Sequence, residues 1–253
     1  MAARLGAALA VAVALAGAVA AALADGDGRR DAPTRRDEGA HIVVLGSSTA
    51  AGTGTSHPES SWVARYGALL AVAGHGDSVT NLAAGGYTTY HVMPAGARPP
   101  EGRPLSDSLR NITRALRLAP DAVIVNLPSN DIAYGYSIGE VLACYDIIAA
   151  AARRAGVPVW FMTSQPRNLE AEGRRSLAAV RDSTLARYGA HAIDFWEGLA
   201  DGDGAIDARF DVGDGIHLND AGHRILFERV ARAAVAESAR AAHGLWPTGR
   251  QRR

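Results

Sequence analysis

The segment His41-Ile42-Val43-Val44-Leu45-Gly46-Ser47-Ser48-Thr49 joins a short apolar run to a turn that carries hydroxyl groups. An apolar run of this length that ends at a glycine is typical of a strand buried on both faces. Small residues continue in Ala50-Ala51-Gly52, so another group can approach the Ser48 hydroxyl closely. The segment therefore predicts a buried strand that ends at an accessible serine.

Further along the chain, apolar runs of strand length alternate with segments of helical periodicity. More strands are predicted at Ser78–Leu82, Asp121–Leu127, Val157–Met162 and Ala190–Phe195. Helices are predicted from Ser60 or Ser61 to Ala73, over Glu140–Ala155, around Leu177–Tyr188, and from Asn219 to just before Gly244. This alternation favours an α/β fold in which helices cover both faces of a parallel, five-stranded sheet. Ligands bind beyond the carboxyl ends of such strands, so residues that follow different strands are expected to meet at one edge.

The composition is that of an ordinary globular protein. The chain has 253 residues, of which 48% are hydrophobic and 21% charged, and its net formal charge is zero. Nothing in this balance indicates nucleic acid or an anionic membrane as a partner. All 26 basic residues are arginine, which excludes lysine chemistry and suggests a bacterial genome of high GC content. Cys144 is the only cysteine, so an internal disulfide is excluded, and its apolar helix face predicts a core position.

The N-terminus has the pattern of an export signal. Arg4 precedes a stretch without charge over residues 5–24, and Ala22-Leu23-Ala24 fits the small-x-small cleavage rule. We therefore expect residues 1–24 to be a signal peptide and the protein to be periplasmic or extracellular. The alternative is an uncleaved anchor over residues 5–24, and only then is the membrane a partner. Residues 25–40 are predicted to be a flexible linker, 41–243 the folded domain and 244–253 a basic tail.

A second chemical motif occurs far downstream, in Asp214-Gly215-Ile216-His217. A serine hydroxyl is a poor nucleophile until a base takes its proton, and a carboxylate is needed to fix the tautomer of that base. One loop can present both groups at this spacing, with Asp214 bound to one ring nitrogen and the other nitrogen facing Ser48. These residues predict Ser48 as nucleophile, His217 as base and Asp214 as its orienting acid. His223, within the last predicted helix, is expected to face solvent.

Two turns between these motifs supply hydrogen-bond donors. Gly85-Gly86 offers backbone N–H groups that no Cβ atom obstructs, and Asn130, in Pro128-Ser129-Asn130-Asp131, offers a side-chain amide. Both kinds of donor suit the oxyanion of a tetrahedral intermediate. Each turn follows a predicted strand, so we expect both at the same sheet edge as Ser48.

The segment from Tyr87 to Pro104 is long and rich in proline and glycine, and long loops beside a site often shape its pocket. Tyr87, Tyr90 and Tyr134, together with Tyr136, lie near the ends of the motifs and are candidates for binding a sugar-sized substrate. Ordinary loop packing is the alternative for these side chains. The acidic segment Asp201–Asp207 does not match a calcium loop, so we interpret it as a turn and expect no metal site.

Four short motifs resemble the motif blocks of the SGNH, or GDSL-type, hydrolases, and they occur in the same order over about residues 41–223. They are Gly46-Ser47-Ser48, Gly86, Asn130-Asp131 and Asp214-x-x-His217. The resemblance implies a flavodoxin-like, three-layer α/β/α fold with a doubly wound sheet. It also implies Ser48 as nucleophile, with its N–H, the Gly86 N–H and the Asn130 side chain as oxyanion donors. His217 is then the base, and Asp214 orients it. Ser47 stands where the family usually has Asp, and Pro128 where it usually has Gly.

These observations favour an exported serine esterase, of the carboxylesterase or acetylesterase type, that needs no cofactor. Its expected substrates are short-chain acyl esters, including O-acetyl groups on carbohydrate, because no apolar stretch beyond the N-terminus resembles a lipid-binding lid. Two alternatives remain open. One is an acyltransferase that uses the same three residues, and the other is a non-catalytic, carbohydrate-binding envelope protein on the same fold.

Overall fold

A parallel sheet forms the centre of the computed structural model, which describes residues 39–244. Its five strands are β1 (His41–Gly46), β2 (Ser78–Asn81), β3 (Ala122–Asn126), β4 (Val159–Met162) and β5 (Ala192–Ile193). They lie in the order β2-β1-β3-β4-β5, and every neighbouring pair is parallel. This is the flavodoxin-like order of a doubly wound sheet. The predicted fold class and the five parallel strands are therefore confirmed.

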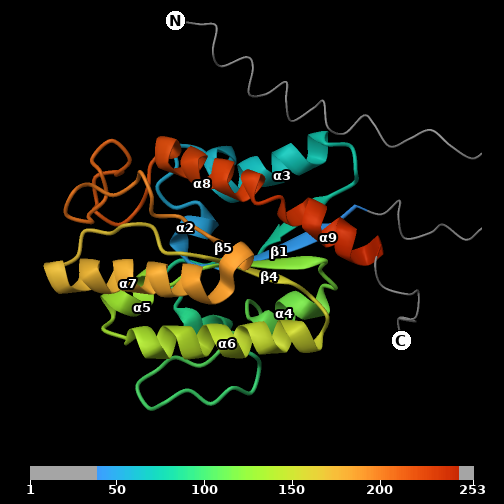
Figure 1. Cartoon of the computed structure of the whole chain (residues 1–253), viewed down its shortest axis with the longest axis horizontal. Coiled ribbons are helices and arrows are strands. Elements are labelled where there is room, and N and C mark those ends of the chain that lie inside the picture. The colour runs from blue at the N-terminus through green and yellow to red at the C-terminus, as the bar shows by residue number, and fades with distance from the viewer. Residues whose placement is uncertain (1–38, 245–253) are drawn as a thin grey trace, which may run out of the picture. The chain divides into compact units, whose positions relative to one another are not determined.

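Helices cover both faces of the sheet (Figure 1). One face carries α3 (Trp62–Val72), α8 (Asp220–Arg232) and α9 (Val235–Gly244), and the other carries α4 (Ile112–Arg117), α6 (Ile138–Arg154) and α7 (Ala171–Tyr188). Two short helices, α2 (Ser48–Ala51) and α5 (Ser129–Ala133), follow β1 and β3 closely. Short 3-10 helices lie at Pro58–Ser60, Thr89–Val92 and Gly189–His191.

The sheet divides the core into two parts, because alternate side chains of a strand point to opposite faces. On β1, Ile42 and Val44 belong to the cluster beneath α3 and α8. Val43 and Leu45 belong to the cluster beneath α4, α6 and α7. All four side chains are fully buried, which accounts for the nearly continuous apolar sequence of this strand. Packing on both faces therefore fixes β1 and the turn that follows it.

Polar side chains cap the helices at the predicted starts. Ser61 caps α3 by accepting the Ala64 N–H at 3.2 Å. Asn219 caps α8 by accepting the N–H groups of Ala221 and Gly222. These bonds satisfy donors that the first turn of a helix leaves unpaired.

The single helix predicted from Asn219 to Gly244 is wrong, since the structure has α8 and α9 in its place. Ala234 lies between them with a φ of 50°, a left-handed conformation in which helical hydrogen bonding cannot continue. The change of direction buries Val235 and Ala236 fully in the core, which opposes the local backbone cost.

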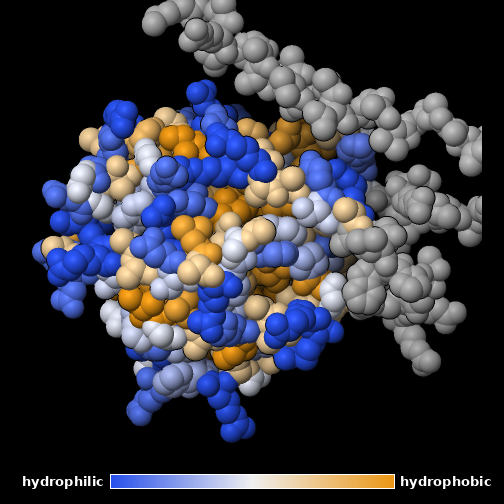
Figure 2. Space-filling model, viewed as in Figure 1, coloured by the Kyte–Doolittle hydropathy of each residue, from blue (hydrophilic) through white to orange (hydrophobic). Residues whose placement is uncertain are grey.

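Several predicted boundaries lie outside the described residues: the signal peptide (1–24), nearly all of the linker (25–40) and all but the first residue of the basic tail (244–253). Among the described residues, no helix has the length and apolar character needed to cross a membrane. On the face shown in Figure 2, hydrophilic residues surround smaller apolar patches.

Candidate active site

Ser48 lies just beyond the carboxyl end of β1, at the start of α2. The turn is tight: a Cβ atom on Gly46 would lie 2.7 Å from the Ala50 Cβ and 2.9 Å from the Asn126 carbonyl oxygen, so glycine is needed there. The Ser47 N–H donates to the same carbonyl at 3.2 Å. This bond attaches the turn to β3 and fixes Ser48 at the edge of the sheet.

The order of the strands places this turn at a topological switch point. From β1 the chain passes to β2 on one side, whereas from β3 it passes to β4 on the other. The connections after β1 and β3 therefore diverge at the carboxyl ends of these two strands, the position where ligands bind in sheets of this kind. Ser48 follows β1 and Asn130 follows β3, so both lie at this switch point.

His217 reaches the same edge from the segment that precedes α8. Its Nε2 lies 2.9 Å from Ser48 Oγ, and its Nδ1 lies 2.6 Å from Asp214 Oδ2. An ionised carboxylate can only accept, so Nδ1 carries a proton and Nε2 accepts the Ser48 hydroxyl. The structure thus brings together the three side chains that the sequence analysis combined, although 169 positions separate Ser48 from His217.

The Asp214 carboxylate is fixed by its own loop. Its Oδ1 accepts the backbone N–H groups of Ile216 and His217, each at 2.8 Å. Burial acts to raise the pKa of Asp214, but the hydrogen bonds from the His217 side chain and from these N–H groups outweigh it and lower the pKa. The Asp214 side chain is 45% exposed and that of His217 is 17% exposed. Asp214 is therefore charged at neutral pH and holds the imidazole from its solvent side.

Ser48, Gly86 and Asn130 offer hydrogens that an oxyanion could accept. Within residues 39–244, the backbone N–H groups of Ser48 and Gly86 donate to no protein acceptor. Asn130 Nδ2 donates one hydrogen to the Tyr87 carbonyl oxygen at 2.9 Å, and its second hydrogen has no acceptor among the residues that the structure describes. Because Tyr87 follows Gly86, this bond joins the two turns that were predicted to hold the oxyanion. Their role as donors stays a prediction.

Arg167, which follows β4, is a residue of this site that the sequence analysis missed. Its Nη1 donates to Asn130 Oδ1 at 3.0 Å and lies 3.5 Å from Ser129 Oγ. Burial lowers the pKa of the Arg167 guanidinium, while Tyr134 and Asp214 act in the opposite direction. A signal was present in the sequence, because Arg167 comes after the carboxyl end of a strand, as Asn130 does.

Asp131 provides a second connection between the segment after Gly86 and the segment that carries Asn130. Its Oδ1 accepts the Thr89 hydroxyl at 2.5 Å and the Thr89 N–H at 2.9 Å. The carboxyl group is fully buried, and this burial raises its pKa to about 7 despite the bonds from Thr89. The contact attaches the 3-10 helix that follows the Gly86 turn to α5, which carries Asn130. Only the motif position of Asp131, not this contact, was visible in the sequence.

His223 is fully buried, so its predicted position in solvent is wrong. Its Nδ1 accepts the Trp62 N–H, and its Nε2 donates to the Thr53 carbonyl oxygen, each at 3.3 Å. The position lies on the inward face of α8 with Leu226 and Val230. Burial lowers the pKa of His223 to about 4. The neutral imidazole therefore links α8 to the loop after α2 and to the start of α3.

The three tyrosines proposed as substrate contacts differ in their surroundings. Tyr87 supplies the carbonyl that binds Asn130, and the Tyr134 N–H donates to the Asn130 carbonyl oxygen at 2.9 Å. The Tyr134 side chain is 60% exposed. Tyr90 is only 5% exposed, and its hydroxyl donates to Glu140 at 3.2 Å. Tyr87 and Tyr134 thus lie beside Asn130, whereas Tyr90 takes part in the packing of the long loop.

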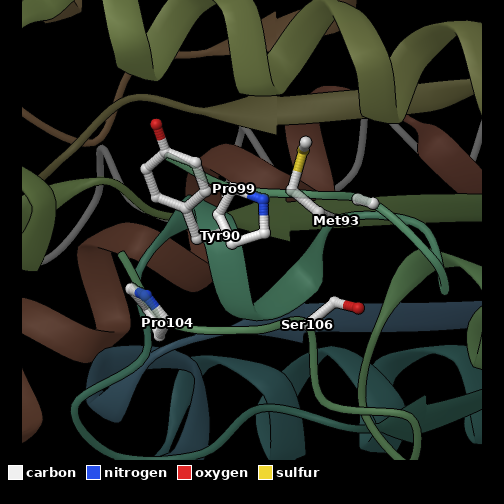
Figure 3. Close-up of a pocket in the computed structure, with 6 residues that line it drawn as sticks. Tyr90, Met93, Pro99, Pro104 and Ser106 are labelled. Atoms are coloured by element: carbon white, nitrogen blue, oxygen red, sulfur yellow. The ribbon is translucent and has the colours of Figure 1, made fainter. Parts of the chain in front are cut away.

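That loop closes around a small hollow of its own (Figure 3). The hollow has no room for a water molecule and is lined by Tyr90, Met93, Ala97, Pro99, Pro104 and Ser106. Arg103 forms an ion pair with Glu140 at 2.8 Å and lies over the Tyr136 ring at 4.0 Å. The loop is therefore fastened to α6, and the residues that line its hollow include neither Ser48 nor His217.

A larger and more open groove lies next to the His217 backbone, and its lining residues include neither Ser48 nor His217. A Cβ atom on Gly54, one of its lining residues, would lie 3.0 Å from the His217 Cβ. Val212 also lines the groove, and its N–H donates to the His217 carbonyl oxygen at 3.1 Å. The groove has a volume of about 660 Å³ and is lined by Gly54, Thr55, Ser56, Asp211, Val212, Asn219, Asp220 and Ala221. The exposed surface of this lining is mostly apolar, and the Ser56 hydroxyl in it donates to the Asp220 carboxylate at 2.5 Å.

Two other interpretations agree with the structure. Asp201 Oδ1 accepts the N–H groups of Asp203 and Ala205, which closes the predicted turn. Cys144 is buried on α6, as expected. Across residues 39–244, no group of three or more His, Cys, Asp or Glu side chains is arranged to hold a metal ion.

The sequence matches the family model described as the GDSL-like lipase/acylhydrolase family over residues 44–225. The match begins in β1 and ends in α8, and it includes Ser48, Gly86, Asn130, Asp214 and His217. No curated protein matches the chain by sequence.

Solved structures of similar fold include several esterases. A psychrotrophic esterase from Pseudoalteromonas sp., inhibited by monoethylphosphonate, is 16% identical with a TM-score of 0.57, covering 76% of this chain and 95% of that one. A catalytic mutant of an acetylxylan esterase from Geobacillus stearothermophilus is 18% identical with a TM-score of 0.58, covering 78% and 94%. A two-domain esterase active on acetylated mannans is 16% identical with a TM-score of 0.54, and the match covers 81% of this chain and 50% of that one. At these identities, the likeness shows the fold alone.

Proposed function

Because the chain belongs to the GDSL-like lipase/acylhydrolase family, we propose that it is a serine esterase that hydrolyses short-chain acyl esters, including O-acetyl groups on carbohydrate. One observation carries this proposal: a continuous hydrogen-bonded chain runs from Ser48 Oγ through the His217 imidazole to Asp214. Activation of a serine hydroxyl requires this combination of groups. The proposed steps need no cofactor.

In the first half-reaction, Ser48 Oγ attacks the ester carbonyl carbon while its proton passes to His217 Nε2. The carbonyl electron pair moves onto oxygen and forms a tetrahedral oxyanion. As this intermediate collapses, the bond to the alcohol oxygen breaks, and His217 returns the proton to that oxygen. Water then attacks the acyl-Ser48 ester in the same way, which releases the acid and restores the serine. Asp214 stabilises the imidazolium that forms in each half-reaction.

The proposed oxyanion hole consists of the Ser48 N–H, the Gly86 N–H and the second hydrogen of Asn130 Nδ2. In its favour, neither backbone N–H has a protein acceptor among residues 39–244, and Asn130 is bound to the residue after Gly86. Removing one such donor typically lowers kcat by about a hundredfold or more. We therefore expect Asn130→Ala to lower kcat by at least that factor.

The groove next to the His217 backbone is the proposed position of a carbohydrate as the leaving alcohol. It adjoins the backbone of His217, whose imidazole would protonate the leaving oxygen, and its volume of about 660 Å³ is large enough for a sugar-sized group. Two proteins of similar fold are described as an acetylxylan esterase and as an esterase active on acetylated mannans. Tyr87 and Tyr134, beside Asn130, are proposed substrate contacts, whereas the buried Tyr90 packs against Tyr136 and donates to Glu140.

Two adjacent serines provide a matched test of the nucleophile. We expect Ser48→Ala to abolish turnover of p-nitrophenyl acetate and labelling by a fluorophosphonate probe. Ser47→Ala removes a neighbouring hydroxyl from the same turn and should retain both. A Ser48→Ala variant with most of the activity would contradict the assignment. Absence of labelling in the intact protein would instead favour a binding protein.

The substrate class is tested by acyl-chain length and by filling the groove. Rates should fall along a series from acetate to palmitate esters, and a preference for long acyl groups would contradict the proposal. Val212→Trp should lower kcat/KM for an acetylated oligosaccharide more than for p-nitrophenyl acetate. Val72→Trp, at an 82% exposed position on α3, is the matched control. An equal effect of Val212→Trp on both substrates would exclude the groove as a sugar site.

Product analysis distinguishes hydrolysis from acyl transfer. With an acetylated donor and a free sugar acceptor present together, the proposed esterase should release acetate as its main product. Predominant acetylation of the acceptor would indicate a transferase that uses the same residues.

We further propose export of the protein, on the basis of the uncharged stretch over residues 5–24 and the cleavage pattern that follows it. Mass analysis of the secreted or periplasmic fraction tests this proposal. A mature chain that begins at Asp25 supports it, and a full-length chain confined to the cytosol would contradict it.

A further inference from the structure

Arg167 lies between the candidate oxyanion donor and the loop that carries the acid. Its Nη1 donates to Asn130 Oδ1 at 3.0 Å. The next residue fixes its backbone, because the Asn168 N–H donates to the Gly215 carbonyl oxygen at 2.8 Å. Gly215 directly follows Asp214 in the acid loop. The guanidinium is therefore placed on Asn130 by a segment that is itself attached to the acid loop.

The two hydrogen bonds of the Asn130 amide allow only one orientation of this group. A guanidinium can only donate, and a backbone carbonyl can only accept. Oδ1 must therefore face Arg167, and Nδ2 must face the Tyr87 carbonyl oxygen at 2.9 Å. A half-turn of the amide would oppose two donors at one end and two acceptors at the other. Without Arg167, the bond from Nδ2 to the Tyr87 carbonyl oxygen would be the one side-chain hydrogen bond left, among the described residues, to orient the amide.

Arg167 also brings a positive charge to the site. Among residues 39–244, no carboxylate lies within ion-pair distance of its guanidinium, and its buried Nε has no hydrogen-bond partner. The side chain is half-buried, so water screens this charge less than at an exposed position. A cation at the amide oxygen polarises the amide and strengthens its N–H groups as donors.

We propose that Arg167 is a positioning residue of the oxyanion hole: it holds the Asn130 amide with Nδ2 toward the reacting carbonyl oxygen and strengthens this donor as negative charge develops. The inference rests on the proposed esterase function and on Asn130 as an oxyanion donor. An effect exerted through the oxyanion appears in the transition state, so its loss lowers kcat and leaves KM nearly unchanged.

Steady-state kinetics with p-nitrophenyl acetate test the proposal, with active sites counted by complete fluorophosphonate titration. Arg167→Met removes the donor and the charge but keeps an unbranched stem. We expect kcat to fall about tenfold to a hundredfold, the usual consequence of losing a charged hydrogen bond. Arg167→Lys should recover part of this loss. Arg174→Met is the matched control, because that guanidinium donates to the carbonyls of Leu169 and Asp203 and should not affect kcat.

The same substitution in an Asn130→Ala background separates positioning from general destabilisation. Once the amide is absent, Arg167→Met should lower kcat little further. Equal fold losses in both backgrounds would overturn the inference, as would an Arg167→Met variant with the kcat of the intact protein. Arg167→Gln, which keeps a donor without the charge, replaces the methionine variant if that variant does not fold, and it should show the same coupling.

Failure of this inference is distinguishable from failure of the proposed function. If Ser48→Ala retains activity, the esterase site itself is wrongly assigned. If Ser48→Ala is inactive while Arg167→Met is as active as the intact protein, only the role of Arg167 is contradicted.

Discussion

Replacing His223 by glutamine should change how the stability of the protein responds to acid. The folded protein holds this imidazole fully buried between Trp62 and Thr53, and burial lowers its pKa from 6.5 to about 4. In the unfolded chain, the same side chain binds a proton below about pH 6.5. The contribution of neutral His223 to the free energy of unfolding is therefore present above pH 6.5 and is lost as the pH falls toward the folded-state pKa.

The magnitude follows from the two pKa values. Between pH 6.5 and about 4, the unfolded state binds one more proton at this site than the folded state does. The free energy of unfolding then decreases by about 1.4 kcal/mol for each pH unit of acidification, or about 3 kcal/mol over the whole range. Glutamine does not titrate there. His223→Gln should be less stable than the intact protein at pH 7.5, because the two hydrogen bonds are disturbed, but it should lose less stability in acid.

Urea unfolding of both proteins at pH 7.5 and pH 4.5 measures this effect. All other titrating groups, including the buried Asp131, are common to both proteins and largely cancel in the difference. That difference in unfolding free energy should shrink by about 2 to 3 kcal/mol between the two pH values. His57→Gln, at an exposed position before α3, is the matched control and should show little change. A His223→Gln difference of the same size at both pH values would refute the buried, neutral imidazole.

Three further predictions concern the residues around the site. Asp214→Asn should lower kcat by about ten-thousandfold, because the tautomer of His217 is no longer fixed, and undiminished kcat would contradict this role. Gly54→Ala should destabilise the protein by at least about 1 kcal/mol and lower kcat, because the φ there is 97° and a Cβ atom would lie 2.4 Å from the Leu218 carbonyl oxygen. Gly198→Ala, also at positive φ but in open space, is its control, and equal thermal shifts in the two variants would exclude the clash. Burial raises the pKa of Asp131 from 3.8 to about 7 in the folded protein, so its protonated carboxyl group contributes to the free energy of unfolding below pH 4. This contribution is lost as the pH rises through 7. Urea titrations should therefore show Asp131→Asn gaining stability relative to the intact protein over that range. A loss of relative stability in Asp131→Asn as the pH rises would contradict the buried carboxyl group.

The central strands could be predicted because their physical signal is local. β1 and β3 are buried on both faces, and such strands are nearly continuous apolar runs in sequence. β5 contains only Ala192 and Ile193, a shorter strand than the apolar run had indicated. The short helices α2 and α5 were missed, because four or five residues are too few to show helical periodicity.

The contact between Ser48 and His217 could be predicted from general rules, because ligands and reactive groups gather beyond the carboxyl ends of parallel strands. Arg167 could not be identified in this way alone, since its significance comes from one tertiary contact with Asn130. For His223 the signal was available: it shares one helical face with Leu226 and Val230, at spacings of three and seven residues. Histidine is intermediate between buried and exposed residue types, so only the helical spacing could reveal its position.

Mapping of a covalent adduct identifies the nucleophile of the site. A fluorophosphonate probe is reacted with the intact protein, and the modified peptide is identified by mass spectrometry. We predict a single adduct on Ser48, retained in Ser47→Ala, absent in Ser48→Ala and formed far more slowly in His217→Ala. An adduct on another residue would contradict Ser48 as the nucleophile, and undiminished labelling in His217→Ala would contradict its activation by the imidazole.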